Sequence, residues 1–166
     1  HAIEEGIRRA GAQPIYVDLA AASLSPSVAT LEAAYQRAVA AGWQVKAVFL
    51  QYTLGVAGPA EELVTWARQH DLLVIEDLAQ SYGAQTADGQ PLGSLGDAVI
   101  LSFGRDKVLD AVAGGAVVYR PHFWSKLKLD GEAWIAAHQP QEPTPLSQVS
   151  RELLYPWLTQ TIRQTY

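Results

Sequence analysis

The chain has 166 residues, of which 49% are apolar and 17% are charged, and its formal net charge is −5. This composition is typical of one globular domain with an ordinary core and unlike that of a disordered chain. The acidic balance gives no electrostatic reason to expect nucleic acid or an anionic membrane as a partner, and no apolar run approaches the roughly 20 residues of a spanning helix.

The sequence contains neither cysteine nor methionine. Without cysteine there are no disulfides, thiolate metal sites or cysteine nucleophiles. A polar stretch follows His1 at once, which is unlike a signal peptide, so we expect a cytoplasmic protein. Because the chain lacks an initiator methionine and opens in a helical pattern, we interpret it as a fragment of a longer protein.

Helical and strand patterns alternate through the first half of the chain. The first helix is predicted over residues 2–10, followed by a short strand over residues 14–18. Ser25 and Pro26 have the residue types of an N-cap and a first helical position. We therefore expect the second helix to begin there and to end at Gly42.

The next elements continue the alternation. A strand is predicted over residues 45–50, a helix over 60–70, and a strand over 72–75 whose unbroken apolar run is typical of burial on both faces. Two further strands are predicted over 98–103 and 115–119. Strands that alternate with helices indicate βαβ units, and the fold expected is a three-layer α/β/α domain with a mostly parallel sheet.

The pattern changes after Pro121. Trp124, Leu127 and Leu129 lie on a possible helix, and the stretch over residues 139–145 has the proline-rich composition of a linker. We therefore divide the chain into a domain over residues 1–138 and a linker with a helical tail over residues 139–166.

Two acidic residues follow the apolar strand that ends at residue 75. In open α/β sheets, ligands bind outside the carboxyl ends of the strands. Glu76 and Asp77 are expected at such an end, where a buried acid is costly unless it meets a cation or a strong donor. A lone aspartate there more often caps the following turn, so both interpretations of Asp77 stay open.

Lys107 follows another strand end and precedes an apolar stretch. A lysine among apolar and cationic neighbours loses its proton easily, and its free amine can then form a Schiff base with a carbonyl. Taken alone, a loop lysine is more often a surface residue, and Lys46, Lys126 and Lys128 are expected to be solvated. Ser102 could donate a hydrogen bond to a phosphate or simply bond locally.

The remaining motifs indicate no other chemistry. The four histidines stand at no metal-ligand spacing, so no metal site is expected, and His70 is expected to cap the end of its helix. No glycine-rich loop matches a dinucleotide or phosphate-loop fingerprint, and no nucleophile-elbow pattern is present. The Gly114-Gly115 pair allows either a close backbone approach or a turn.

Five short motifs occur in order over residues 76–118. They are Glu-Asp-Leu-Ala-Gln at 76–80, Gly-Ala at 83–84, Gly-Ser-Leu-Gly-Asp at 93–97, Ser102-Phe103 with Lys107, and Gly-Gly-Ala-Val-Val at 114–118. Over residues 2–120 the sequence resembles the DegT/StrS-type nucleotide-sugar aminotransferases, which are fold-type-I pyridoxal-phosphate enzymes. Any one motif is weak, whereas five in order are specific.

The resemblance implies a role for each of four residues. Lys107 would form a Schiff base with pyridoxal 5'-phosphate and then move the proton between substrate and cofactor. Asp77 would face the pyridine nitrogen and keep it protonated. Gln80 would lie near the ring oxygen, and Ser102 would bind the phosphate.

The resemblance also implies a function for the whole protein. It would transfer an amino group, with glutamate as the expected donor, to a keto-sugar nucleotide, and it would work as a homodimer. Residues 1–138 would then be part of the cofactor-binding large domain, and residues 139–166 would lead toward a small domain. Other pieces of the family site are expected upstream of His1, and Tyr52 is a possible neighbour of the site because many members have histidine in that segment.

Two alternatives remain beside this interpretation. Some relatives dehydrate a deoxysugar on the same scaffold, but they carry histidine in place of the lysine, so Lys107 opposes that interpretation. The other alternative is a non-catalytic module or remnant of the same fold. It is opposed by the intact set of Asp77, Gln80, Ser102 and Lys107.

Overall fold

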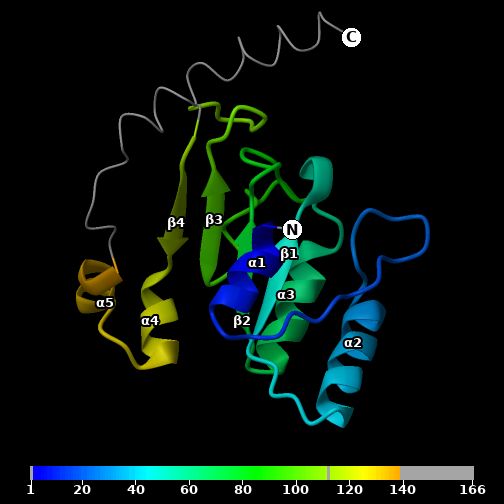
Figure 1. The fold of residues 1–166 in the computed structure, drawn as a ribbon. Coiled ribbons are helices and arrows are strands. Elements are labelled where there is room, and N and C mark those ends of the chain that lie inside the picture. Colours follow the sequence, from blue (N-terminus) through cyan, green and yellow to red (C-terminus); the bar gives the residue numbers. More distant parts are fainter. Residues whose placement is uncertain (1, 112, 139–166) are drawn as a thin grey trace, which may run out of the picture.

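The computed structural model describes residues 2–111 and 113–138 (Figure 1). The predicted linker and tail over residues 139–166 lie outside the described residues. The elements are, in chain order, α1 (Ala2–Arg9), α2 (Val28–Ala40), β1 (Ala47–Gln51), the 3₁₀ helix η1 (Thr53–Gly55), α3 (Ala60–Gln69), β2 (Leu73–Asp77), β3 (Ala98–Ser102), β4 (Gly115–Tyr119), α4 (Pro121–Leu127) and α5 (Gly131–His138).

The strands form one sheet in the order β1-β2-β3-β4. The β1, β2 and β3 strands run parallel to one another, whereas β4 pairs antiparallel to β3. Parallel neighbours need a long crossover connection, and α3 supplies one between β1 and β2. No helix lies between β3 and β4 in the part of the chain that is described, and the chain simply turns back. The predicted α/β class with a mostly parallel sheet is confirmed.

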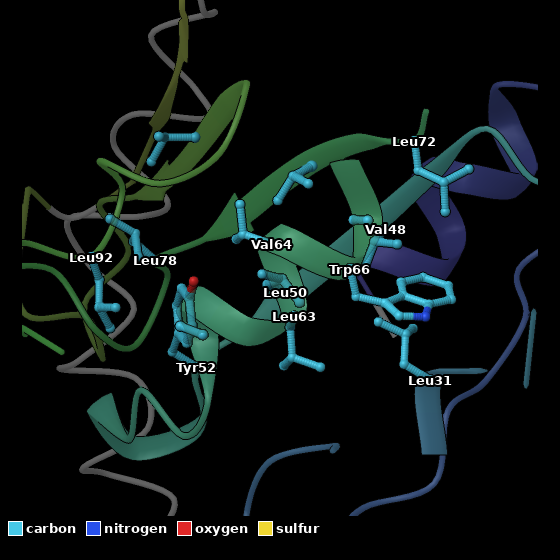
Figure 2. Packing of buried hydrophobic residues seen from close by; sticks show 14 residues of the cluster. Leu31, Val48, Leu50, Tyr52, Leu63, Val64, Trp66, Leu72, Leu78 and Leu92 are labelled. Carbon is cyan, nitrogen blue, oxygen red and sulfur yellow. The ribbon is translucent and has the colours of Figure 1, made fainter. Parts of the chain in front are cut away.

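The core lies between the sheet and α3. The α3 helix packs against β1 and β2, and α2 packs against α3. Figure 2 shows the side chains that fill this space, among them Leu50, Leu63, Val64 and Trp66. Side chains on a strand alternate between its two faces. The core therefore takes Val74 and Glu76 from β2 and leaves Asp77 on the opposite face of the sheet.

The second helix begins two residues later than the sequence predicts. Its N-cap is Ser27, whose hydroxyl accepts from the Thr30 amide at 3.2 Å while the Thr30 hydroxyl accepts from the Ser27 amide at 3.0 Å. This reciprocal capping box satisfies two backbone donors at once. Ser25 is instead buried in the loop before the helix, and a Cβ added at Gly58 would lie 2.4 Å from the Ser25 Cβ.

The strand predicted over residues 14–18 is wrong. The segment joins α1 to α2 as a loop (Figure 1) and pairs with no strand among the described residues. Two of its apolar side chains are correspondingly open to solvent, with Ile15 41% and Tyr16 66% exposed. A strand is held by its ladder partner and by cross-strand neighbours, which a local apolar pattern does not guarantee.

The last described elements follow the sheet. Pro121 stands in the first turn of α4, as expected from its fixed φ, and the helix ends where Lys128 adopts a left-handed conformation with φ 55°. A helix around Trp124 is thus confirmed, but Leu129 lies beyond it. No helix among the described residues is long and apolar enough to cross a membrane.

Candidate active site at the carboxyl edge of the sheet

The two strand ends that carry unusual residues lie next to each other. Asp77 is the last residue of β2 and Ser102 the last of β3. Because β2 and β3 are parallel, both ends lie at the same edge of the sheet. The register pairs Asp77 with Ile100, and residues two apart on a strand share a face. Asp77 and Ser102 therefore lie on one face, opposite α3.

Asp77 is a buried carboxylate with spare hydrogen-bonding capacity. It is only 6% exposed, and its Oδ1 accepts from the Ala79 amide at 2.9 Å. It does cap the following turn, as one of the two interpretations expects. Its Oδ2 has no hydrogen bond with the rest of the described chain, and a carboxylate can accept several. Burying a carboxylate that has one hydrogen-bond donor costs free energy. An additional N–H donor to Oδ2 would offset part of that cost.

Two glycines keep the backbone beside Ser102 free of side chains. Gly115 pairs with Ser102 across the sheet, and a Cβ added at Gly115 would lie 2.6 Å from the Leu101 carbonyl oxygen. Gly114 has a φ of 108°, which glycine adopts without strain. The pair thus provides both a close backbone approach and a turn, the two possibilities that the sequence leaves open. Ser102 itself is half-buried.

Gln80 links two loops at this edge. Its side chain is exposed, and its Oε1 lies 3.4 Å from the Leu54 amide nitrogen. Leu54 is a non-glycine residue in the left-handed region, with φ 56°, a conformation that costs free energy unless its surroundings hold it. A Cβ added at the next residue, Gly55, would lie 3.8 Å from the Ala84 Cβ. The loop after β1 and the loop after β2 therefore lie against each other.

Lys107 lies in the connection from β3 to β4. Its side chain is 19% exposed, and its ammonium forms an ion pair with Asp106 Oδ2 at 3.1 Å. This hydrogen bond lowers the pKa of the Asp106 carboxyl. No ion pair joins Lys107 to Asp77 within the described residues. The four residues singled out in the sequence thus gather at one edge of the sheet and its adjoining loops, and their roles stay a prediction.

A fifth residue of this region, Glu76, is missing from the sequence-based set. Its side chain is fully buried, with 0% exposure. Four donors surround its carboxylate: the Tyr52 hydroxyl at 2.9 Å and the backbone amides of Gly93 at 2.7 Å, Leu95 at 2.9 Å and Gly96 at 2.5 Å. Such a set compensates the burial of a charge.

Tyr52 points into the core rather than toward the strand edge. It is 3% exposed, and Figure 2 shows it beside Leu78 and Leu92. Burial raises the pKa of its hydroxyl, and the neighbouring Glu76 carboxylate raises it further. The hydroxyl is therefore a permanent donor to Glu76. The sequence predicts Tyr52 as a possible neighbour of the site. In the structure its hydroxyl contacts Glu76, the residue before Asp77.

Asp97 holds a separate polar cluster near the other end of the strands. It is 2% exposed, and its carboxylate accepts from the Val74 amide at 2.8 Å, from His122 Nε2 at 2.8 Å and from Lys126 Nζ at 3.0 Å. Burial alone would raise the pKa of Asp97, but the hydrogen bonds from Val74, Lys126 and His122 outweigh it and lower that pKa. Lys126 lies at the surface as expected, with its side chain 36% exposed, and its ammonium also forms an ion pair with Asp97 that joins α4 to this carboxylate.

The remaining polar features lie away from the candidate site. His70 follows α3, and its Nδ1 donates to the Trp66 carbonyl at 2.9 Å, which confirms the expected cap. A cavity of about 420 Å³ lined by Trp43, Lys46 and Asp71, among others, opens at the amino ends of β1 and β2, not at the carboxyl edge. No group of three or more potential metal ligands occurs among the residues that the structure describes.

The fold is an α/β domain whose parallel strands carry Asp77 and Ser102 at their carboxyl ends, the edge at which open α/β sheets generally bind ligands. The model of the DegT/DnrJ/EryC1/StrS aminotransferase family matches residues 1–126, and the chain belongs to this family.

Two curated relatives and one solved structure illustrate the membership. The chain is 34% identical to a pleiotropic regulatory protein of Geobacillus stearothermophilus over 68% of this chain and 28% of the relative. It is 32% identical to UDP-N-acetyl-3-dehydro-alpha-D-glucosamine 3-aminotransferase of Acidithiobacillus ferrooxidans, over 78% of this chain and 33% of that protein. A DegT DnrJ EryC1 StrS aminotransferase from Brucella abortus superimposes with a TM-score of 0.69 at 25% identity, over 87% of this chain and 39% of that one. The chain thus spans about a third of the length of these relatives.

Proposed function

We propose that this chain is part of a pyridoxal-phosphate-dependent aminotransferase that transfers an amino group to a keto-sugar nucleotide. The observation that carries the proposal is the buried Asp77 carboxylate with an unused acceptor oxygen, at a strand edge shared with Ser102 and followed by Lys107, in a chain of this family. The name of the Acidithiobacillus relative, a 3-aminotransferase of a dehydro sugar nucleotide, supports this substrate class.

The residues at the strand edge fit the cofactor. Asp77 offers an anionic acceptor for the protonated ring nitrogen, and the pairing would compensate the burial of its charge. Ser102 offers a hydroxyl for the phosphate beside a backbone that Gly114 and Gly115 keep bare. Gln80 would lie near the ring oxygen. When bound, pyridoxal phosphate supplies an electron sink for the carbon that loses its proton.

Lys107 would carry the covalent link and move the proton at the reacting carbon. Its Nζ is paired with Asp106 in this structure, so that ion pair has to open before the amine becomes attached. Asp106 is 79% exposed, and water can replace the lysine as its partner at little cost because surface ion pairs contribute little free energy.

The other parts of the proposal concern the whole protein. We propose a homodimer in which the partner subunit completes the site, glutamate as the amino donor, and a cytoplasmic location. Residues 1–138 would be part of the large domain, and residues 139–166 would lead toward the small one.

The proposal is tested by trapping the cofactor on the full-length protein. After pyridoxal phosphate and borohydride are added, peptide mapping should find the reduced adduct on Lys107. Lys107→Ala should lose the adduct, whereas the control Lys46→Ala, which removes an exposed lysine, should keep it. An adduct that persists in Lys107→Ala would remove Lys107 from its assigned role.

The role of Asp77 has its own test. Asp77→Asn removes the charge that would keep the ring nitrogen protonated while it preserves the shape of the side chain. We expect the variant to bind some cofactor and to lose turnover on the order of 10²-fold, the loss typical of removing one well-placed electrostatic partner. Unchanged turnover would show that Asp77 does not face the reacting system.

A further inference from the structure

The side chains of the adjacent residues Glu76 and Asp77 lie on opposite faces of the sheet. Adjacent residues of a strand project to opposite sides. Glu76 points into the core beneath the sheet, with 0% exposure, whereas Asp77 points to the face that carries Ser102. Among the residues that the structure describes, the Asp77 carboxylate accepts a single hydrogen bond, from the Ala79 amide. The position of its carboxylate therefore depends on the backbone of β2 at residues 76–77.

The Glu76 carboxylate fixes that backbone from the core side. Its Oε2 accepts from Tyr52, the residue that follows β1, and from the Gly93 amide. Its Oε1 accepts from the Leu95 and Gly96 amides, in the segment that leads into β3. One side chain of β2 thus connects the residue after β1, the end of β2 and the approach to β3.

The glycine at position 96 is a requirement of this arrangement. A Cβ added there would lie 2.9 Å from the Val74 carbonyl oxygen and 3.1 Å from Glu76 Oε1, closer than side-chain atoms pack. Only glycine lets this amide reach the carboxylate. The Gly-Ser-Leu-Gly segment of the sequence, to which the proposed cofactor chemistry gives no role, is therefore explained as the receptor for Glu76.

We propose that Glu76 and Tyr52 are positioning residues for the cofactor edge, which hold the Asp77 carboxylate in place through the backbone of β2. This inference rests on the proposed function, and it adds two residues that do not touch the cofactor. The Tyr52 hydroxyl is protonated at neutral pH even at its ordinary pKa of about 10, and burial raises that pKa further, so it can always donate to Glu76.

Tyr52→Phe is the variant that tests the proposal. It removes one of the donors to Glu76 and leaves the backbone amides in place, so the fold is retained. Glu76→Gln is less useful, because an amide nitrogen facing these donors would disrupt the segment and the fold with it. The matched control is Val64→Ala, which removes buried methyl groups from α3 (2% exposed) and leaves every donor to Glu76 in place.

The measurements are made on the full-length protein: the dissociation constant of pyridoxal phosphate, the pH midpoint of the bound cofactor's absorbance, and the thermal midpoint. We expect Tyr52→Phe to raise the dissociation constant about three- to tenfold, the size of one hydrogen bond, and to shift the pH midpoint. Val64→Ala should lower the thermal midpoint but keep the wild-type dissociation constant and pH midpoint.

The outcomes separate this inference from the proposed function. Wild-type cofactor affinity and pH midpoint in Tyr52→Phe would overturn the positioning role while the trapped adduct on Lys107 still upholds the proposed function. Equal changes in both variants would overturn it as well, because they would reflect general destabilisation. If the wild-type protein forms no adduct on Lys107, the proposed function itself fails.

Discussion

Replacing Asp97 with alanine tests how a polar cluster joins α4 to the sheet. The carboxylate is 2% exposed and accepts from the Val74 amide at 2.8 Å. Without it, a buried backbone N–H loses its acceptor, which costs about 1–3 kcal/mol. The ion pairs with His122 and Lys126 involve side chains that are 51% and 36% exposed. Solvent screens them, so each contributes only about 0–1 kcal/mol. We expect Asp97→Ala to lower the free energy of unfolding by about 2–4 kcal/mol.

The assay is urea unfolding of this chain followed by circular dichroism, with two comparison variants. Asp97→Asn keeps an oxygen that can accept from the Val74 amide and loses only the charge, so its cost should be about half as large. Lys126→Ala removes one half-exposed partner and should cost at most about 1 kcal/mol. We therefore expect the loss of free energy of unfolding to be largest for Asp97→Ala, smaller for Asp97→Asn and smallest for Lys126→Ala. If Asp97→Ala lowered the free energy of unfolding no more than Lys126→Ala, the buried hydrogen bond from the Val74 amide would contribute nothing measurable to stability.

The same cluster predicts a pH dependence. Burial acts to raise the pKa of Asp97, but the Val74 amide, Lys126 and His122 together hold it below its ordinary value. The folded state therefore binds fewer protons than the unfolded state near this pKa. The stabilisation is fully present above the unfolded pKa of roughly 3.9 and is lost as the pH falls through the folded pKa. The stability difference between wild type and Asp97→Asn should shrink below about pH 4; an unchanged difference there would contradict the assignment.

Three further predictions concern the framework around the site, each measured by the midpoint and slope of urea unfolding. Gly96→Ala places a methyl group 2.9 Å from the Val74 carbonyl oxygen and should cost about 1–3 kcal/mol, whereas a neutral result would show that the segment shifts freely. Ser27→Ala removes the N-cap of α2 and should cost about 1 kcal/mol; Ser25→Ala should leave the cap intact. Leu63→Ala empties a core position that is 2% exposed and should cost about 2–5 kcal/mol, and a smaller loss would mean that the core collapses around the gap.

The framework of the fold could be predicted from the sequence where local patterns and burial agree. The strand predicted over residues 72–75 and the helix over 60–70 differ by at most two residues at either end from β2 (Leu73–Asp77) and α3 (Ala60–Gln69). Their apolar residues fall at the spacing that packing against each other requires. The segment over residues 14–18 has a similar apolar pattern but pairs with no strand among the described residues. Its local β propensity alone is therefore not enough to form a strand.

The candidate site could be predicted only in part, because its contacts are of two kinds. The side proposed to bind the cofactor could be predicted from the order of the short motifs that contain Asp77, Ser102 and Lys107. The Glu76 network is formed by long-range contacts, such as that from Tyr52, 24 residues earlier. One local signal was available: a residue adjacent to Asp77 on a strand projects to the opposite face, so an acid there had to find donors in the core.

The pairing of Lys126 with Asp97 shows the same limit at the other end of the strands. The lysine lies in a polar stretch of sequence, which favours solvation, and its partner is 29 residues away. Nothing local joins them until β4 turns back along β3 and brings α4 beside the start of that strand. The contact is a product of topology, and topology is what a propensity pattern does not contain.

Two neighbouring residues of β2 differ in how many hydrogen bonds their carboxylates accept from the described residues. Among the described residues, Glu76 accepts from four donors that all lie within residues 52–96, so groups of the chain itself hold the core side of β2. Within the described part of the chain, the Asp77 carboxylate accepts from one donor, and the ion pair of Lys107 is with its exposed neighbour Asp106. A site whose support is satisfied while its binding groups are not binds its ligand with little loss of conformational entropy. On the proposed function, the buried Glu76 network would thus hold Asp77 in position for the ring nitrogen of the cofactor.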